Sequence, residues 1–377
     1  MALTIGVPKE TAAGEYRVAL VPEVVARLKR DGLDVVVESG AGEAAHHADA
    51  AYEEKGARIG DRAAAFGADV VAKVQPPTDE EIALLSAGTV LIGFLSPLNQ
   101  PEISEKLAAR GVTALSMELV PRISRAQKMD ALSAMASLGG YKAVLVAATS
   151  LPKFFPLLTT AAGTIRPANV LILGAGVAGL QAIATARRLG ARVAAYDIRE
   201  AVREEVQSLG GTFVELELEI ADMQDAGGYA KALVEEKARR QTELLVPHIA
   251  KADVVITTAL IPGRRAPILV TREAVEEMAS GAIIIDMAAP NGGNCALTTP
   301  GETVVHNGVQ ILGPLNLPAT MPVHSSQLYA RTVMAMIQEF AGEEGFATDF
   351  EDDIFKGACV THGGAVVHER VKSLLTA

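Results

Sequence analysis

The sequence predicts an α/β protein with two Rossmann-like, doubly wound parallel-sheet domains, separated by a cleft and bridged by long helices. Short apolar runs rich in β-branched residues alternate with helix-like stretches, which is typical of parallel sheets covered on both faces. The runs form two blocks, one before about residue 120 and one after about residue 168. A stretch with helical periodicity, SRAQKMDALSAMASLGGYKAVLVAATSL, lies between the blocks and predicts a bridge between two domains.

The predicted strands follow in order along each block. The first block contains LTIGV, DVVVESG, DVVAKVQ, VLIGFLS and VTALSME, and the second contains NVLILGAG, RVAAYDI, DVVITTAL, AIIIDMA and VQILG. These runs are too short for helices and do not alternate strictly, as expected of strands buried on both faces. SQLYARTVMAMIQEFA then predicts a helix, and we expect this tail to return to the first domain. The predicted domains are residues 1–130 plus 320–377 and residues 131–319.

Composition excludes several classes of protein. With 34 Lys+Arg and 45 Asp+Glu the net charge is -11, the wrong sign for binding nucleic acid through its phosphates. Charges, Gly and Pro interrupt every apolar run before the roughly 20 residues that cross a bilayer, and MALTIGVPKE has no signal-peptide pattern. Cys295 and Cys359 suit a reducing compartment, so we expect a cytoplasmic protein. Cys359 and His362 lack the second ligand pair of a zinc site, and no metal site is predicted.

The most specific motif is NVLILGAGVAGLQAIATARRLGARVAAYDIRE, which reads as strand, glycine-rich turn, helix and second strand. Its glycines allow a tight turn, close approach of a pyrophosphate to the backbone, and packing of the helix on the strand. Asp197 ends the second strand, where an acidic residue meets the adenosine ribose of a dinucleotide. The predicted cofactor-binding residues of this motif are Gly174, Ala175, Gly176, Val177, Ala178, Gly179, Asp197, Ile198 and Arg199.

Asp197 also favours one dinucleotide. A carboxylate accepts hydrogen bonds from the 2′- and 3′-hydroxyls of NAD(H) and repels the 2′-phosphate of NADP(H). Arg199 has two interpretations, because it either softens that exclusion or is simply solvated. A glycine turn that binds nothing is the alternative for the whole motif, but the strand, turn, helix and acidic residue together favour NAD(H).

Loops after later strands are expected at the same edge, because ligands of open α/β sheets lie across the carboxyl ends of the strands. TTALIPGRRAP adds the candidates Thr258, Ala259, Leu260 and Gly263, and DMAAPNGGN lies in the next such loop. Ordinary turn chemistry explains both loops equally well. A long connection containing ADMQDAGGYAK, with Tyr229, is either a mobile lid or a plain surface excursion.

A second candidate site lies in VPRISRAQKMDALSA. Ser124 and Gln127 fit a capping box, and Asp130 falls early in the predicted helix, so a helix start explains these residues. In a helix that begins just after Ser124, however, Gln127, Asp130 and Ser133 share one face, and Arg122 lies just before it. An amide and an Arg–Asp pair supply the donor and acceptor that a nicotinamide carboxamide needs.

The chain resembles the NAD(H)-binding component, domain I, of proton-translocating nicotinamide nucleotide transhydrogenase. The resemblance covers nearly the whole chain and is related to a second family, alanine dehydrogenase, which shares the two-domain fold and the first two of the motifs. The motifs are VPKETAAGEYRVALVP, DVVAKVQPP, RISRAQKMDALSAMASLGGYKA, GAGVAGLQAIATARRLGARVAAYDIR, AGGYAK, TTALIPGRRAP and GGNC.

The resemblance implies that Arg122, Gln127 and Asp130 contact the nicotinamide end of NAD(H), with Ser133 nearby, and that Tyr229 belongs to a mobile loop. It implies a Si/Re-specific oxidoreductase component that passes a hydride directly between its NAD(H) and NADP(H) on a partner domain. A separate membrane-spanning subunit couples this transfer to proton translocation. The implied partners are that proton-conducting subunit, the NADP(H)-binding subunit and a second copy of this chain. The homodimer would lie at the inner face of the cytoplasmic membrane.

Alanine dehydrogenase differs at an informative position. Arg17 and Lys73 match two of that family's three oxo-acid residues, but Ser96 stands where the family has a histidine. Serine does not act as an imidazole acid–base at neutral pH, so we expect Arg17 and Lys73 to pair with carboxylates across the domain cleft. Two alternatives remain: a self-contained amino-acid dehydrogenase, against which Ser96 counts, and a non-catalytic NAD sensor, against which the polar set around Arg122 counts.

Overall fold

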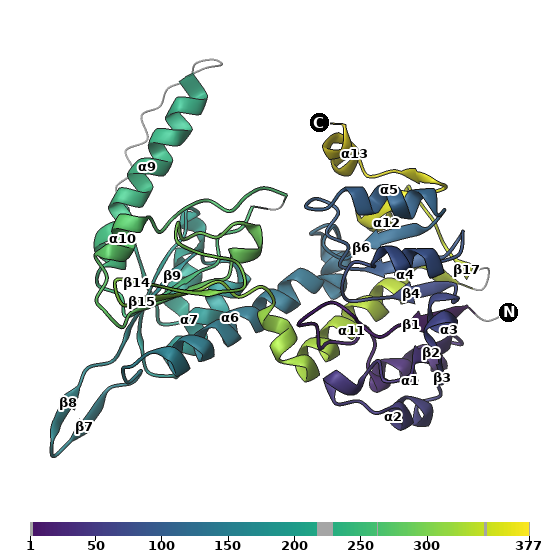
Figure 1. Cartoon of the computed structure of the whole chain (residues 1–377), viewed down its shortest axis with the longest axis horizontal. Coiled ribbons are helices and arrows are strands. Elements are labelled where there is room, and N and C mark those ends of the chain that lie inside the picture. The colour runs from purple at the N-terminus through teal and green to yellow at the C-terminus, as the bar shows by residue number, and fades with distance from the viewer. Residues whose placement is uncertain (1–2, 217–228, 262, 343–344, 377) are drawn as a thin grey trace. The chain divides into compact units, whose positions relative to one another are not determined.

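The computed structural model describes residues 3–216, 229–261, 263–342 and 345–376. The chain divides into two compact units (Figure 1). Unit 1 comprises Met1–Met135 and Pro318–Ala377, and unit 2 comprises Ala136–Leu317. Unit 1 is therefore assembled from both ends of the chain, whereas unit 2 is one continuous segment.

The main sheet of unit 1 is mostly parallel. Its strands are β1 (Thr4–Val7), β2 (Asp34–Glu38), β3 (Arg58–Gly60), β4 (Val70–Ala72), β5 (Val90–Gly93), β6 (Thr113–Ser116), β18 (Cys359–His362) and β19 (Ala365–Val366). Among the described residues, these eight strands lie in the order β19-β18-β6-β5-β4-β1-β2-β3. The strands β1 to β6 pair in parallel, while β18 runs antiparallel to both β6 and β19. The order 3-2-1-4-5-6 of the parallel strands is that of a doubly wound fold.

Helices connect these strands and complete unit 1. They are α1 (Pro22–Arg30), α2 (Asp49–Glu54), α3 (Arg62–Phe66), α4 (Asp79–Leu84), α5 (Glu102–Ala109), α11 (Pro322–Phe340), α12 (Asp353–Ala358) and α13 (Glu369–Leu375), with the 3₁₀ helices η1 (Glu43–Ala45), η2 (Ser124–Met129) and η5 (Leu317–Thr320). A small antiparallel pair, β16 (Ala341–Gly342) and β17 (Gly345–Phe346), follows α11. Local sequence explains several helix starts: Thr78 and Glu81 form a capping box at α4, and the Asp352 side chain caps α12.

Unit 2 repeats the same strand order. Its main strands are β9 (Asn169–Leu173), β10 (Arg192–Tyr196), β11 (Thr212–Phe213), β12 (Val254–Thr257), β13 (Ile283–Asp286), β14 (Thr303–His306) and β15 (Val309–Leu312). In the described part of the chain they lie in the order β11-β10-β9-β12-β13-β15-β14, and β14 alone is antiparallel. The strand order reverses between β9 and β12, which is where ligands bind in such sheets.

Two apolar clusters place helices on both faces of this sheet. The helices of unit 2 are α6 (Ala131–Ser150, which begins in unit 1), α7 (Val177–Arg188), α8 (Arg203–Ser208), α9 (Tyr229–Ile249) and α10 (Arg272–Glu276), with η3 (Glu200–Val202) and η4 (Ala289–Asn291). One cluster combines Ile172 and Ile256 with residues of α6 and α7, and the other combines Leu171 and Val255 with residues of α9 and α10. Alternate strand residues therefore enter opposite cores.

Every apolar run that the sequence predicted as a strand forms one, and the predicted tail helix is α11. The strands that the prediction missed are short or exposed, among them β3, β14 and the hairpin of β7 (Leu158–Thr160) and β8 (Gly163–Ile165). That hairpin projects away from the sheet of unit 2 (Figure 1). Such strands lack the continuous apolar pattern of a buried strand, so hydrophobicity alone does not reveal them.

Helix α6 corrects the expectation that every apolar run is too short to cross a bilayer. It is long and apolar enough for a membrane span by length and composition. However, Ala143, Val144 and Ala147 are fully buried in the core of unit 2. A Cβ atom at Gly140 would lie 2.1 Å from the carbonyl oxygen of Ala178, so α6 packs closely against α7. We therefore interpret α6 as a core helix.

Candidate functional site

The turn between β9 and α7 has the backbone that its glycines allow. Gly174 adopts a φ of +103°, in the region that favours glycine. A Cβ atom at Gly179 would lie 1.9 Å from the carbonyl oxygen of Gly174, so this position must lack a side chain for α7 to pack on the turn. A Cβ atom at Gly176, by contrast, meets no described atom within 4 Å. The turn thus has open space in front of Gly176.

The amino end of α7 faces this space without a protein anion. Gly176 is its N-cap, and within the described residues no side chain caps the helix and no acidic residue occupies its first turn. Val177 and Ala178 supply the first N–H groups, which have no acceptor inside the helix. These N–H groups and the helix dipole favour a bound anion. The turn therefore fits the pyrophosphate of a dinucleotide.

Asp197 follows β10 at the same edge of the sheet and is held by four donors. The N–H of Ala175 donates to Oδ2 at 2.8 Å, and the N–H of Arg199 donates to Oδ1 at 2.8 Å. The Arg199 side chain adds Nε to Oδ1 at 3.0 Å and Nη2 to Oδ2 at 3.1 Å. Burial acts to raise the pKa of Asp197, but the bonds from Arg199 and Ala175 outweigh burial and lower that pKa, so the group is a carboxylate at neutral pH. Ile198, between these residues, is 75% exposed.

The loop after β12 is tied to the glycine turn. The Thr258 hydroxyl donates to the carbonyl oxygen of Gly174 at 2.9 Å. Leu260 is exposed, and Gly263 adopts a φ of +71°. Because β9, β10 and β12 are neighbours, the glycine turn, Asp197 and residues 258–260 meet at one edge of the sheet.

Asn294 holds this loop, and the sequence analysis did not single it out. Its Nδ2 donates to the carbonyl oxygens of Ala259 at 2.9 Å and Pro267 at 2.7 Å. The N–H of Ala259 donates back to Asn294 Oδ1 at 3.0 Å. The side chain is fully buried, so it acts as an internal substitute for a neighbouring strand.

Asp286 is a second buried polar residue that the sequence analysis missed. Its carboxylate accepts hydrogen bonds from the hydroxyls of Thr257 and Thr298 and from the N–H groups of Ala288 and Cys295. These bonds join the end of β12 to the loop after β13. The motif DMAAPNGGN contains both Asp286 and Asn294, but its letters do not show which polar side chains point inward.

The stretch VPRISRAQKMDALSA forms two helices rather than one. The 3₁₀ helix η2 has Ile123 as its N-cap and no side-chain cap, so the predicted capping box at Ser124 is wrong. Helix α6 starts at Ala131, and Asp130 caps it by accepting the N–H of Ser133 at 2.8 Å and the Ser133 hydroxyl at 2.6 Å. The physical reason is that an aspartate offers its acceptors to free N–H groups at a helix start more readily than inside a helix. Gln127 and Ser133 therefore do not share a helix face.

Arg122 and Gln127 remain available for a ligand. Both side chains are exposed, and neither makes a hydrogen bond or ion pair within the described residues. Their neighbours Arg125 and Lys128 pair with Glu339 of α11 at 3.0 and 2.7 Å, which fixes η2 on unit 1. The structure thus brings Asp130 and Ser133 together and leaves Arg122 and Gln127 free, all within unit 1.

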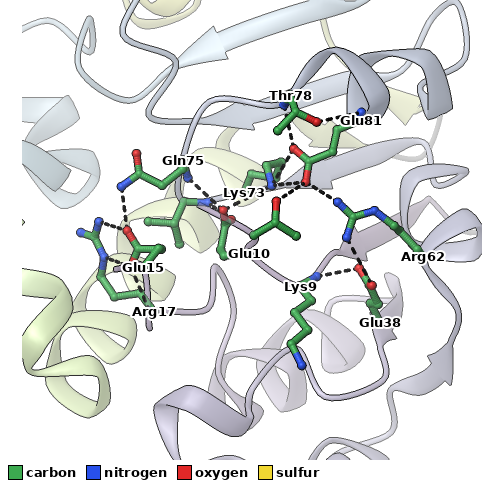
Figure 2. A network of polar contacts seen from close by, with 12 residues as sticks. Lys9, Glu10, Glu15, Arg17, Glu38, Arg62, Lys73, Gln75, Thr78 and Glu81 are labelled. Carbon is green, nitrogen blue, oxygen red and sulfur yellow. Dashed lines mark hydrogen bonds and ion pairs between the residues drawn. The ribbon is translucent and has the colours of Figure 1, made fainter. Parts of the chain in front are cut away.

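Figure 2 shows the buried polar network around Arg17 and Lys73. Arg17 donates Nε and Nη2 to Glu15 at 2.7 and 2.6 Å. The Lys73 ammonium is 1% exposed and lies 3.3 Å from Glu10 and 3.2 Å from Glu81. Burial raises the pKa of Glu10, although Lys73 opposes that rise. Both cations pair with carboxylates as expected, but the expectation that these partners lie across the domain cleft is wrong, because all of them belong to unit 1.

Ser96 lies in a strained turn rather than beside a free imidazole. Its φ is +50°, and its N–H donates to Glu118 at 2.6 Å. The N–H of Leu95 and the Ser116 hydroxyl also donate to Glu118. Burial raises the pKa of the Glu118 carboxyl. Glu118, which the sequence analysis did not notice, therefore supports this turn.

The predicted lid lies largely outside the described residues. Residues 217–228, which include most of ADMQDAGGYAK, are not among them. Tyr229 is the first residue of α9, and its side chain also lies outside the described part of the chain.

Comparison with known proteins identifies the family. The model of the alanine dehydrogenase/PNT N-terminal domain matches residues 6–139, and that of the C-terminal domain matches residues 143–369. The chain belongs to the alanine dehydrogenase/PNT family. This result confirms the resemblance inferred from the motifs.

Members of this family differ in how similar they are to the chain. An NAD(P) transhydrogenase subunit alpha protein of Rhodospirillum rubrum is 45% identical over 376 residues, covering 97% of this chain and 98% of that protein. The crystal structure of transhydrogenase from Sinorhizobium meliloti has a TM-score of 0.88 and 43% identity, covering 97% of this chain and 100% of that one. The alanine dehydrogenase of Bacillus subtilis is 30% identical over 381 residues, covering 98% and 94%.

Proposed function

We propose that this chain is the NAD(H)-binding component of a proton-translocating transhydrogenase. It exchanges a hydride directly with NADP(H) held by a partner domain, and a membrane subunit couples the exchange to proton movement. The observation that carries the proposal is the edge of unit 2 where the open turn at Gly176, the uncapped end of α7 and the Asp197 carboxylate meet. The greater identity to transhydrogenase relatives than to alanine dehydrogenase supports it.

The chemistry asks little of the protein beyond positioning. Hydride transfer between the C4 atoms of two nicotinamides moves no proton on the reacting atoms, so no acid–base residue is needed. The Gln127 amide offers one donor and one acceptor to the nicotinamide carboxamide, and the Arg122 guanidinium adds further donors. Asp130 holds the start of α6 through Ser133 and so orients this region. Asp197 and the turn at Gly176 anchor the adenosine and pyrophosphate.

The dehydrogenase alternative is disfavoured by the network around Lys73. An oxo acid needs cations that are free to meet its carboxylate, whereas Arg17 and Lys73 are already neutralised by buried glutamates. Ser96 supplies no imidazole for proton transfer. The sensor alternative leaves the free side chains of Arg122 and Gln127 without a role.

The proposal includes partners and a location. NADP(H) is bound by a separate subunit, and the membrane-spanning subunit holds this chain at the cytoplasmic face of the membrane. We also propose a homodimer. The β7–β8 hairpin supports it, because Leu157 and Ile165 are 61% and 48% exposed and an isolated two-stranded hairpin is only marginally stable in water.

Mixing the chain with its NADP-binding partner tests the proposed function. We expect no turnover by the chain alone and hydride transfer from NADH to an NADP⁺ analogue once the partner is added, measured by stopped-flow absorbance. Gln127→Asn keeps the amide but shortens its reach, so transfer should slow by about tenfold or more while the Kd for NADH changes only a few-fold.

Gln207→Asn, an exposed change in α8, serves as the matched control and should transfer at the normal rate. Undiminished transfer by Gln127→Asn would remove this residue from the nicotinamide site. Oxidation of NADH by pyruvate and ammonium without a partner would contradict the proposed function itself.

Removing the Asn294 amide should loosen the loop that carries Ala259. Asn294→Ala leaves the N–H and carbonyl of Ala259 without their buried partner, and we expect the Kd for NADH to rise by about tenfold. Asn291→Ala is the control in the same loop, because the Asn291 side chain makes no hydrogen bond within the described residues. Calorimetric titration of both variants decides the matter, and equal affinities would contradict a positioning role for Asn294.

A further inference from the structure

The hydrogen bonds to Asp197 fill the acceptor capacity of its carboxylate. Oδ1 accepts the N–H and the Nε–H of Arg199, and Oδ2 accepts the N–H of Ala175 and an Nη2–H of Arg199. An ionised carboxylate has about four lone-pair positions in all. Two donors on each oxygen therefore leave no position for the ribose hydroxyls of a dinucleotide.

The two bonds from the Arg199 side chain are the ones that a ligand can replace. The backbone donors are fixed by the turn at Ala175 and by the chain after β10, whereas the guanidinium side chain is 60% exposed. Its removal frees one acceptor position on each carboxylate oxygen. A cis diol presents one hydroxyl donor to each of two neighbouring oxygens, which matches those positions.

We infer that the Arg199 side chain occupies the ribose-binding positions of Asp197 in the nucleotide-free protein and is displaced by the 2′- and 3′-hydroxyls of NAD(H). This inference rests on the proposed function and adds an internal competitor to its binding site. The displacement costs little, because an ion pair with one exposed partner contributes only about 0–1 kcal/mol. Arg199 also keeps the Asp197 charge compensated while no nucleotide is bound.

The same exchange sets the choice between coenzymes. NADH replaces the two Arg199 bonds with two hydroxyl donors. A 2′-phosphate brings no such donor and repels Asp197, but it pairs well with a guanidinium released nearby. Arg199 therefore opposes NAD(H) binding and favours NADP(H), so it narrows the discrimination that Asp197 imposes.

Arg199→Leu tests this role by removing the competitor. We expect the Kd for NADH to fall about three- to tenfold, while the Kd for NADPH stays unchanged or rises, as measured by calorimetry. Arg188→Leu, at the opposite end of α7, makes the same change of charge and should alter the two affinities by a similar small factor. Weaker NADH binding in Arg199→Leu, or an equal change for both coenzymes, would overturn the inference.

The Arg199 Nε–H signal gives a direct readout of displacement. In ¹⁵N NMR spectra of the full chain this signal should shift when 5′-AMP is added. It should stay in place at saturation with 2′,3′-dideoxy-AMP, which lacks both hydroxyls. An identical response to both probes would overturn the inference but leave the proposed function intact, whereas failure of the wild-type chain to bind NADH or AMP would contradict both.

Discussion

Gly176→Val is expected to abolish NADH binding and leave the fold intact. The φ of Gly176 is -77°, which any residue adopts, and a Cβ atom there meets no described atom within 4 Å. The valine side chain would instead fill the space that the pyrophosphate needs. We expect the Kd for NADH to rise at least about 100-fold, or about 2.7 kcal/mol, in a fluorescence titration. The melting temperature should stay within about 2 °C of wild type.

Gly179→Ala is the contrasting control in the same motif. Its Cβ atom would collide with the carbonyl oxygen of Gly174 at 1.9 Å, so this smaller change should lower the melting temperature. Normal NADH affinity in Gly176→Val would exclude the turn from the binding site.

Lys73→Met should destabilise the protein by about 3–5 kcal/mol at pH 7, the range found when one partner of a buried ion pair is removed. Methionine has a similar length, so the loss arises from Glu10 and Glu81, which remain buried without their cation. Urea unfolding measures the change. Lys9→Met is the matched control, because Lys9 is 47% exposed and lies 3.7 Å from Glu43, and its effect should stay within about 0.5 kcal/mol.

The Lys73→Met defect should also depend on pH. Burial raises the folded-state pKa of Glu10 above its ordinary value of 4.5, and loss of Lys73 would raise it further. A carboxyl with a raised folded-state pKa binds more protons when folded, so its contribution to stability falls as pH rises from the unfolded to the folded pKa. The deficit relative to wild type should therefore be smaller at pH 5 than at pH 7. A deficit of equal size at both values would show that buried carboxylates do not cause it.

The features predicted from sequence are those that local residues determine. Buried parallel strands such as β12 and β13 are continuous apolar runs, and the GxGxxG turn places its glycines where the backbone needs them. The break at Asp130 was not predicted, because two patterns overlap there. The spacing suits one long helix, whereas the packing of η2 against α11 and the acceptors of Asp130 favour two shorter ones.

Burial of polar side chains was the main aspect of the site that the sequence did not disclose. Asn294 and Glu118 bind backbone groups far away in the chain, so their roles depend on the completed fold. Asp197 and Arg199 are two residues apart, and their pairing needs only a local turn. Spacing alone still left two interpretations of Arg199, because solvation and ion pairing of an exposed arginine differ little in free energy.

The assembly of unit 1 from both ends of the chain has a consequence for biosynthesis. A ribosome makes β6 long before it makes β18, which pairs with the open side of β6. All of unit 2 is translated in between, and that unit has every strand of its own sheet once residue 312 has emerged. The nascent chain therefore carries an unpaired strand edge beside a finished neighbour, and such an edge is prone to pair with other chains. Translation that stops before residue 359 would leave unit 2 complete and the edge of β6 unprotected.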